Sequence, residues 1–209
     1  MTDILPPQIL CIYGSPRKGG NSDVLMDSFA GGVESAGGVA HRLYLRDMKL
    51  FPCREIHACA KSGECVLKDD LTPLFTKLME VDAFTLSSPV MFYGVPAIAK
   101  AFIDRCQSLW ARKYVLNMPV ATGRLKNRKG VLLSLGGSNG KKLFDGVRLT
   151  FRYFLDTLDA SPWGEILLRG VDDKGDIFKE EEGLANAAAL GRQLVETLNT
   201  EIKDVAGGG

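Results

Sequence analysis

The sequence has neither a long apolar run nor an excess of charge of one sign. No stretch of its 209 residues approaches the roughly 18 consecutive apolar residues that a transmembrane helix needs. Its Lys and Arg residues number 26 and its Asp and Glu residues 25, so the formal net charge is +1. Nothing electrostatic therefore favours nucleic acid or an anionic membrane, and we expect neither as a partner.

The chain also lacks an export signal and an even set of cysteines. Residues 1–7, Met-Thr-Asp-Ile-Leu-Pro-Pro, contain no basic segment followed by a long apolar one. Five cysteines are an odd number, and reduced thiols are the simplest account of it. We therefore expect a cytoplasmic protein.

No internal repeat, low-complexity linker or domain boundary interrupts the chain. An apolar content of 45% and a charged content of 24% are typical of globular proteins. A chain of this length can build one full α/β core. We expect one domain over residues 1–209, with only the glycines of residues 207–209 resembling a frayed tail.

The most informative segment follows a short apolar run at residues 9–13. Residues 14–22 read Gly-Ser-Pro-Arg-Lys-Gly-Gly-Asn-Ser and lead into an amphipathic helix pattern. Such a loop can direct N–H groups and hydroxyls at an anion, and the helix N-terminus adds partial positive charge. The loop contains neither of the two common nucleotide-binding motifs, which are Gly-x-x-x-x-Gly-Lys-[Ser/Thr] and Gly-x-Gly-x-x-Gly. A hydroxyl-rich loop of this kind suits a terminal phosphate monoester, such as that of FMN. The alternative is an ordinary turn, with Ser22 as the helix N-cap.

Strand and helix patterns alternate along the rest of the chain. Five strands separated by helices predict a doubly wound parallel α/β sheet with helices on both faces. Ligands of such sheets bind at the carboxyl ends of the strands, where the winding direction reverses. The flavodoxin-like class has the strand order 2-1-3-4-5, which would bring the loops after strands one and three together. The strands are expected at residues 9–13, 39–45, 83–87, 131–135 and 163–168, and Asp69-Asp70 is expected to cap a helix.

Two later loops favour a flavin at that edge. Residues 89–94, after the third strand, are Pro-Val-Met-Phe-Tyr-Gly, and their flat or soft apolar groups suit stacking on a heteroaromatic ring. The loop over residues 133–140 is bare backbone with small hydroxyls, which can approach a flavin closely. The alternatives are that the apolar stripe belongs to the core and that the glycine-rich loop is a simple turn.

These residues resemble a known family. Three segments are similar to the flavodoxin-fold NADPH-dependent FMN reductases. They are residues 14–22, residues 88–96 with Lys-Ala-Phe-Ile-Asp-Arg at 100–105, and Lys-Gly-Asp-Ile at 174–177. The similarity is strongest to the branch that contains the iron–sulfur flavoproteins, and it extends from about residue 9 to 198. It implies non-covalent FMN, NAD(P)H as electron donor, a small acceptor such as a flavin or quinone, and a homodimer or homotetramer.

The resemblance also assigns cofactor-binding roles. No catalytic side chain and no metal ligand is implied, because the flavin carries the redox chemistry. The phosphate would be held by Ser15, Arg17, Asn21 and Ser22, and the ring would contact Pro89, Val90, Met91, Phe92, Tyr93, Gly94, Ser134, Gly136 and Gly137.

The cysteines depart from the family pattern. The iron–sulfur branch has Cys-x-x-Cys-x-x-Cys with a fourth cysteine nearby, whereas here Ile56 stands between Cys53 and Cys59, and Cys65 follows. A [4Fe–4S] cluster normally takes four cysteines. We therefore interpret this segment as the remnant of a cluster-binding segment. Zinc on Cys53, Cys59 and either His57 or Cys65 remains an alternative.

Two classes of function follow. The first is an FMN-dependent NAD(P)H oxidoreductase. The alternative is a flavodoxin-like or iron–sulfur electron carrier, but such carriers use strong charge for steering, and a net charge of +1 offers none. The phosphates of the nicotinamide donor need cations. Lys18, Arg112, Lys113 and Arg124 are candidates, with a solvated surface as their alternative.

Overall fold

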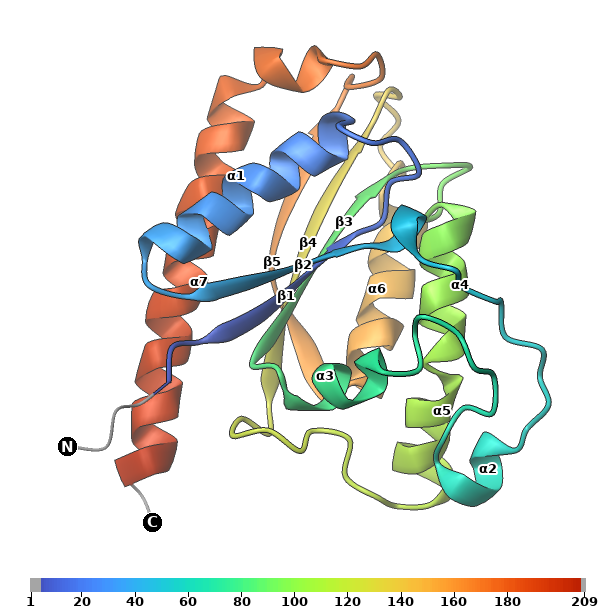
Figure 1. The fold of residues 1–209 in the computed structure, drawn as a ribbon. Coiled ribbons are helices and arrows are strands. Elements are labelled where there is room, and N and C mark those ends of the chain that lie inside the picture. The colour runs from blue at the N-terminus through green and yellow to red at the C-terminus, as the bar shows by residue number, and fades with distance from the viewer. Residues whose placement is uncertain (1–4, 208–209) are drawn as a thin grey trace.

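A computed structural model describes residues 5–207 as a parallel five-stranded sheet in the order β2-β1-β3-β4-β5 (Figure 1). This is the flavodoxin-like order, so the predicted fold class is confirmed. The five strands are β1 (Gln8–Tyr13), β2 (Val39–Tyr44), β3 (Ala83–Pro89), β4 (Arg128–Gly136) and β5 (Ala160–Arg169).

Helices cover both faces of the sheet. Two long helices, α1 (Asn21–Ser35) and α7 (Glu181–Gly207), pack together on one face (Figure 1). The other face carries α3 (Leu74–Glu80), α4 (Ala97–Arg105) and α6 (Asp145–Thr157). Each face buries its own hydrophobic cluster, which is expected when parallel strands are covered on both sides. The short helices are α2 (Cys59–Ser62), α5 (Gln107–Trp110), a π-helical turn over Ala111–Val115 and 3-10 turns over Leu45–Asp47 and Asp176–Lys179.

The central strands are buried for almost their whole length. In β1 the five residues after Gln8 are all buried, and in β4 all but one are. The outer strand β2 is half-buried, as its mixed composition predicts. No helix within residues 5–207 combines the length and the apolarity that crossing a membrane requires.

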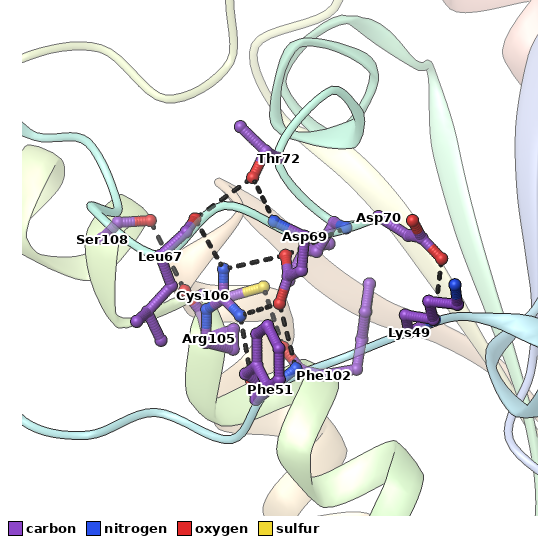
Figure 2. A network of polar contacts seen from close by, with 11 residues as sticks. Lys49, Phe51, Leu67, Asp69, Asp70, Thr72, Phe102, Arg105, Cys106 and Ser108 are labelled. Atoms are coloured by element: carbon purple, nitrogen blue, oxygen red, sulfur yellow. Dashed lines mark hydrogen bonds and ion pairs between the residues drawn. The ribbon is translucent and has the colours of Figure 1, made fainter.

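One helix begins later than its sequence suggests. Asp69 and Asp70 were expected to cap a helix, but α3 begins at Leu74 with Pro73 at its N-cap. The Asp69 carboxylate instead pairs with Arg105 of α4 (Figure 2). A buried charge needs a partner, and this long-range ion pair outweighs a local cap.

Candidate functional site

Three loops meet at the carboxyl edge of the sheet. Tyr13 at the end of β1 pairs with Ser87 of β3, and Pro89 at the end of β3 pairs with Leu135 of β4. The loops that follow β1, β3 and β4 therefore leave the sheet side by side. The chain winds in opposite directions from β1 and β3, so this edge is the switch point at which α/β sheets bind ligands.

The loop after β1 presents the N-terminus of α1. Gly20 is the N-cap residue, and no side chain caps the helix. The first N–H groups of a helix have no partners within it, and together with the helix dipole they attract anions. The Ser15 hydroxyl lies in the loop that precedes the helix, where it accepts from the Arg17 N–H at 3.1 Å. The predicted cap role of Ser22 is not adopted, because the helix begins at Asn21.

An ion pair that the sequence did not reveal fixes this loop. The Asp23 carboxylate accepts from the Gly19 N–H at 2.9 Å and lies 2.9 Å from an Arg46 nitrogen. The Arg46 guanidinium also lies 4.7 Å from the centroid of the Tyr44 ring. Arg46 follows β2 and joins Asp23 only through the pairing of β2 with β1. In the sequence, the one local indication of this ion pair was an acidic residue in the first turn of α1.

Asn21 connects the loop after β1 to the loop after β5. Its amide nitrogen donates to the Asp173 carbonyl at 2.8 Å, and its amide oxygen accepts from the Gly175 N–H at 2.9 Å. Arg17 reaches the same loop, donating to the Asp172 carbonyl at 3.3 Å. Both predicted phosphate ligands thus also hold residues 172–175, which contain part of the Lys-Gly-Asp-Ile segment.

The loop after β3 folds into a tight turn with unusual residues at its tip. Met91 and Gly94 exchange two backbone hydrogen bonds of 2.9 Å, and the residues between them, Phe92 and Tyr93, have φ values of 48° and 61°. Left-handed φ at two successive positions normally calls for Asn or Gly. The Phe92 side chain is completely exposed and that of Tyr93 is 56% exposed. Strain of this kind persists mainly where function requires it.

The remaining predicted ring contacts lie between β3 and β4. Val90 donates its N–H to the Leu135 carbonyl at 2.9 Å, which places it beside Gly136. The Ser134 hydroxyl is fully buried and donates to the Ser88 carbonyl at 2.8 Å, so its side chain joins the two strands. Gly137 is exposed and lies against Asp172, so close that a Cβ would be 2.8 Å from that side chain.

This edge fits a flavin mononucleotide. The open N-terminus of α1 with the Ser15 hydroxyl suits a phosphate, and the exposed aromatic turn after β3 suits a planar ring. Both features occur at the switch point, where the fold class places such a ligand. The structure thereby brings together the residues that the sequence placed on three separate loops.

The cysteine segment lies elsewhere. The turn α2 is at the far end of the molecule from the carboxyl tips of β1, β3 and β4 (Figure 1). There a cavity of about 900 Å³ opens between this segment and the helices α4, α5 and α6. Its walls include four thiols and several large apolar side chains, among them Cys53, Cys59, Cys65, Cys106, Ile56, Trp110, Leu149 and Tyr153.

An iron–sulfur cluster does not fit these residues. Within residues 5–207 no three His, Cys, Asp or Glu side chains converge as metal ligands. Ile56 takes the second ligand position and is 56% exposed. Burial raises the pKa of the Cys59 thiol, and the nearby Cys65 and Cys53 add to the effect, whereas metals bind the thiolate.

Three of the predicted nicotinamide-phosphate cations are already engaged. Arg112 donates to the Pro119 carbonyl at 2.7 Å, and Lys113 lies 3.0 Å from the Asp159 carboxylate. Arg124 pairs with Asp82 at 2.6 Å. Asp82 directly precedes β3, so this pair lies at the edge opposite the three loops. Of the four candidates, Lys18 is the one on a site loop.

A parallel sheet of flavodoxin order, with an open helix N-terminus and an aromatic turn at its switch point, defines a flavodoxin-like flavoprotein. The family model described as NADPH-dependent FMN reductase matches residues 7–153. The match spans more than half of the 209 residues, and the chain belongs to this family. It is an oxidoreductase that contains FMN and uses NAD(P)H.

Similar proteins span nearly the whole chain. An iron–sulfur flavoprotein of Methanocaldococcus jannaschii is 27% identical over 198 residues, covering 91% of this chain and 97% of the relative. YwqN of Bacillus subtilis, provisionally named an NAD(P)H-dependent FMN-containing oxidoreductase, is 25% identical and covers 88% and 96%. A solved NAD(P)H:quinone oxidoreductase from Methanothermobacter marburgensis shares the fold, with a TM-score of 0.69 at 19% identity over 90% of this chain and 95% of that chain.

Proposed function

We propose that FMN binds at the carboxyl edge of the sheet, with its phosphate at the N-terminus of α1. The observation that supports this most strongly is that the helix has no side-chain cap, although the Arg17 Nε lies 3.1 Å from the place a Cβ on its N-cap Gly20 would take. The Ser15 hydroxyl belongs to the same loop and binds the Arg17 N–H. The phosphate ligands in this proposal are Ser15, Arg17, Asn21 and Ser22, of which Asn21 acts mainly by holding the neighbouring loop.

The isoalloxazine ring is proposed to lie between the loops after β3 and β4. The exposed turn supplies apolar contact area, and the glycines of the second loop allow close approach of backbone N–H groups. Because Ser134 donates to Ser88, its contribution is to fix the backbone that faces the ring. The proposed contacts are Pro89, Val90, Met91, Phe92, Tyr93, Gly94, Ser134, Gly136 and Gly137.

The reaction proposed is transfer of electrons from NAD(P)H to a small acceptor such as a free flavin or a quinone. When bound, FMN accepts hydride from the nicotinamide and passes electrons on. The chain's own residues position the ring and control access to it, and no protein acid, base or nucleophile is assigned. The name of a quinone reductase with this fold supports this class of acceptor, and the name of the Bacillus relative supports NAD(P)H as donor.

We further propose that the chain acts as one domain and assembles as a homodimer or homotetramer in the cytoplasm, without nucleic acid or membrane. The face around the cysteine cavity supports assembly. Large exposed apolar side chains gather there, and patches of this kind mark interaction surfaces. They include Phe51, Ile56, Val66, Trp110, Tyr114, Leu149 and Tyr153. Sedimentation at micromolar concentration that gave only a 22.7 kDa species would contradict the assembly.

The site is tested by titrating apo-protein with FMN and with riboflavin, which lacks the phosphate. FMN should bind at least tenfold more tightly. Arg17→Ala removes a charge-assisted contact worth about 1.5–3 kcal/mol, a loss of roughly 10- to 150-fold in FMN affinity. Riboflavin affinity should be unchanged in that variant. Arg192→Ala, on the exposed side of α7, is the control. Equal affinity for the two flavins would refute the phosphate site.

The enzyme is distinguished from an electron carrier by anaerobic addition of NADPH to the flavoprotein. Bleaching of the flavin absorbance within seconds supports the reductase. A flavin that dithionite reduces but NADPH does not would support the carrier.

A further inference from the structure

We propose that a surface beside the FMN site, formed by Phe92, Tyr93, Lys141, Lys142 and Arg169, binds the phosphorylated adenosine end of NADPH. This surface would recognise the 2′-phosphate that NADH lacks and so set the choice of nicotinamide donor. The inference rests on the proposed function, because it places the donor next to the proposed flavin.

The elements that carry these residues are in direct contact. Tyr93 packs so closely on the start of α6 that a Cβ on Gly146 would lie 2.2 Å from the Tyr93 carbonyl oxygen. The Tyr93 hydroxyl lies 3.7 Å from the place a Cβ on Gly140 would take. The aromatic turn and the loop between β4 and α6 thus form one continuous surface, which adjoins the proposed ring contacts at 136–137.

Arg169 holds the loop that carries the two lysines. It is the last residue of β5 and pairs in register with Gly136 of β4. Its guanidinium donates to the carbonyls of Gly140 and Lys141, both at 3.4 Å. The guanidinium carbon also lies 5.1 Å from the centroid of the Phe144 ring. A planar cation held in this way is pre-organised, and it fixes the backbone from which Lys141 and Lys142 project.

Lys141 and Lys142 are exposed, and neither takes part in an ion pair within residues 5–207. Other lysines do pair: Lys129 lies 2.7 Å from Glu201, and Lys100 lies 2.6 Å from Asp104. Two successive lysines without carboxylate partners in the described part of the chain, on a loop that a guanidinium holds by its backbone, concentrate positive charge that a dianion would neutralise. A phosphate monoester carries that charge near neutral pH.

Phe92 supplies the second half of the recognition. Its ring is completely exposed at the tip of a turn whose φ of 48° is strained for phenylalanine. Stacking of a base on an aromatic side chain is worth about 1–3 kcal/mol. Tyr93, which follows Phe92 in the turn, lies against the loop that carries the lysines. An exposed aromatic ring and cations on one surface match a purine joined to a phosphorylated ribose. An acidic protein partner would use the cations but would gain nothing specific from the ring.

The first test measures NADPH and NADH oxidation by the FMN-loaded protein with Lys141→Ala and Lys142→Ala combined. Loss of about 1.4 kcal/mol of phosphate binding raises the KM for NADPH about tenfold. The KM for NADH should change less than twofold and kcat should stay the same. The matched control combines Lys61→Ala and Lys203→Ala, two exposed lysines remote from this loop. An unchanged NADPH-to-NADH ratio of kcat/KM in the test variant overturns the proposal.

The second test does not depend on activity. Calorimetric titration of the holoprotein with 2′,5′-ADP and with 5′-AMP should show tighter binding of 2′,5′-ADP, and the lysine variant should lose that preference. Phe92→Ala, titrated with FMN saturating because Phe92 is also a proposed contact of the flavin, should weaken both ligands about equally, because both contain the purine. If FMN fails to bind at all, the proposed function is wrong. If FMN binds normally and the two nucleotides bind alike, only this surface is refuted.

Discussion

The Arg105 guanidinium and the Asp69 carboxylate form an ion pair in which both side chains are fully buried. Figure 2 shows that Arg105 also donates to the carbonyls of Phe51, at 2.9 Å, and Leu67, at 3.4 Å. These two carbonyls bracket the cysteine segment, so one side chain of α4 fastens both of its ends. The segment has little regular structure of its own and depends on this anchor.

Replacing Arg105 should therefore destabilise the protein strongly. Arg105→Met leaves the Asp69 carboxylate buried without its partner, and breaking such pairs typically costs about 3–5 kcal/mol. Denaturant unfolding followed by fluorescence measures the loss. Arg192→Met, on the exposed side of α7, should change the free energy of unfolding by less than about 0.5 kcal/mol. A loss below about 1 kcal/mol for Arg105→Met would contradict the anchor role.

The same pair makes stability depend on acid pH. Burial opposes ionisation of Asp69, but hydrogen bonds from Arg105 and from the Phe51 N–H outweigh it and hold the pKa of the carboxyl below 3.8. A depressed carboxyl pKa contributes stability above the unfolded value and loses it as pH falls through the folded value. The free energy of unfolding should drop below about pH 4. The variant Asp69→Asn should be less stable at pH 7 and show a smaller drop.

Asn21 lies in the proposed phosphate loop, but we expect it also to stabilise the loop after β5. Asn21→Ala removes hydrogen bonds to the Asp173 carbonyl and the Gly175 N–H. We expect a loss of about 1–3 kcal/mol in stability, with faster proteolysis near residues 172–175 and weaker FMN binding. Asn186→Ala, exposed on α7, should have none of these effects. Normal stability of Asn21→Ala would show that the amide is not a structural link.

The aromatic turn should show a trade between stability and binding. Replacing Phe92 with Asn and Tyr93 with Gly suits the left-handed conformation and should raise the melting temperature by about 2–4 °C for each kcal/mol of strain removed. FMN affinity should nevertheless fall, since the proposed ring contacts are lost. Asn117→Gly, at a left-handed φ of 51° in another loop, is the control: it should change stability little, because asparagine already suits this conformation, and leave FMN binding unaltered. Unchanged FMN affinity in the turn variant would refute the contacts.

Local sequence patterns predicted the sheet and the three loops well, because strand periodicity and glycine-rich turns are local signals. The partners of individual side chains were beyond such patterns. Asp69 appeared to be a helix cap, yet it pairs with Arg105, 36 residues away. Asp23 likewise meets Arg46 only through the pairing of two strands. Which cation pairs with which carboxylate depends on strand register and helix packing. Local sequence patterns do not specify either of these.

The last prediction concerns iron. Ile56 offers no electron pair to a metal, and the thiols of the cysteine segment do not converge as ligands. Protein prepared anaerobically should therefore be yellow, with iron far below the four atoms per chain of a [4Fe–4S] cluster. Iron and sulfide analysis measures this, and about four irons per chain would overturn it. Ile56→Cys then separates two causes: uptake of iron by this variant would show that one missing ligand was decisive. Failure of uptake would show that the fold of residues 53–65, where Glu55 and His57 have left-handed φ values of 50° and 58°, has itself diverged.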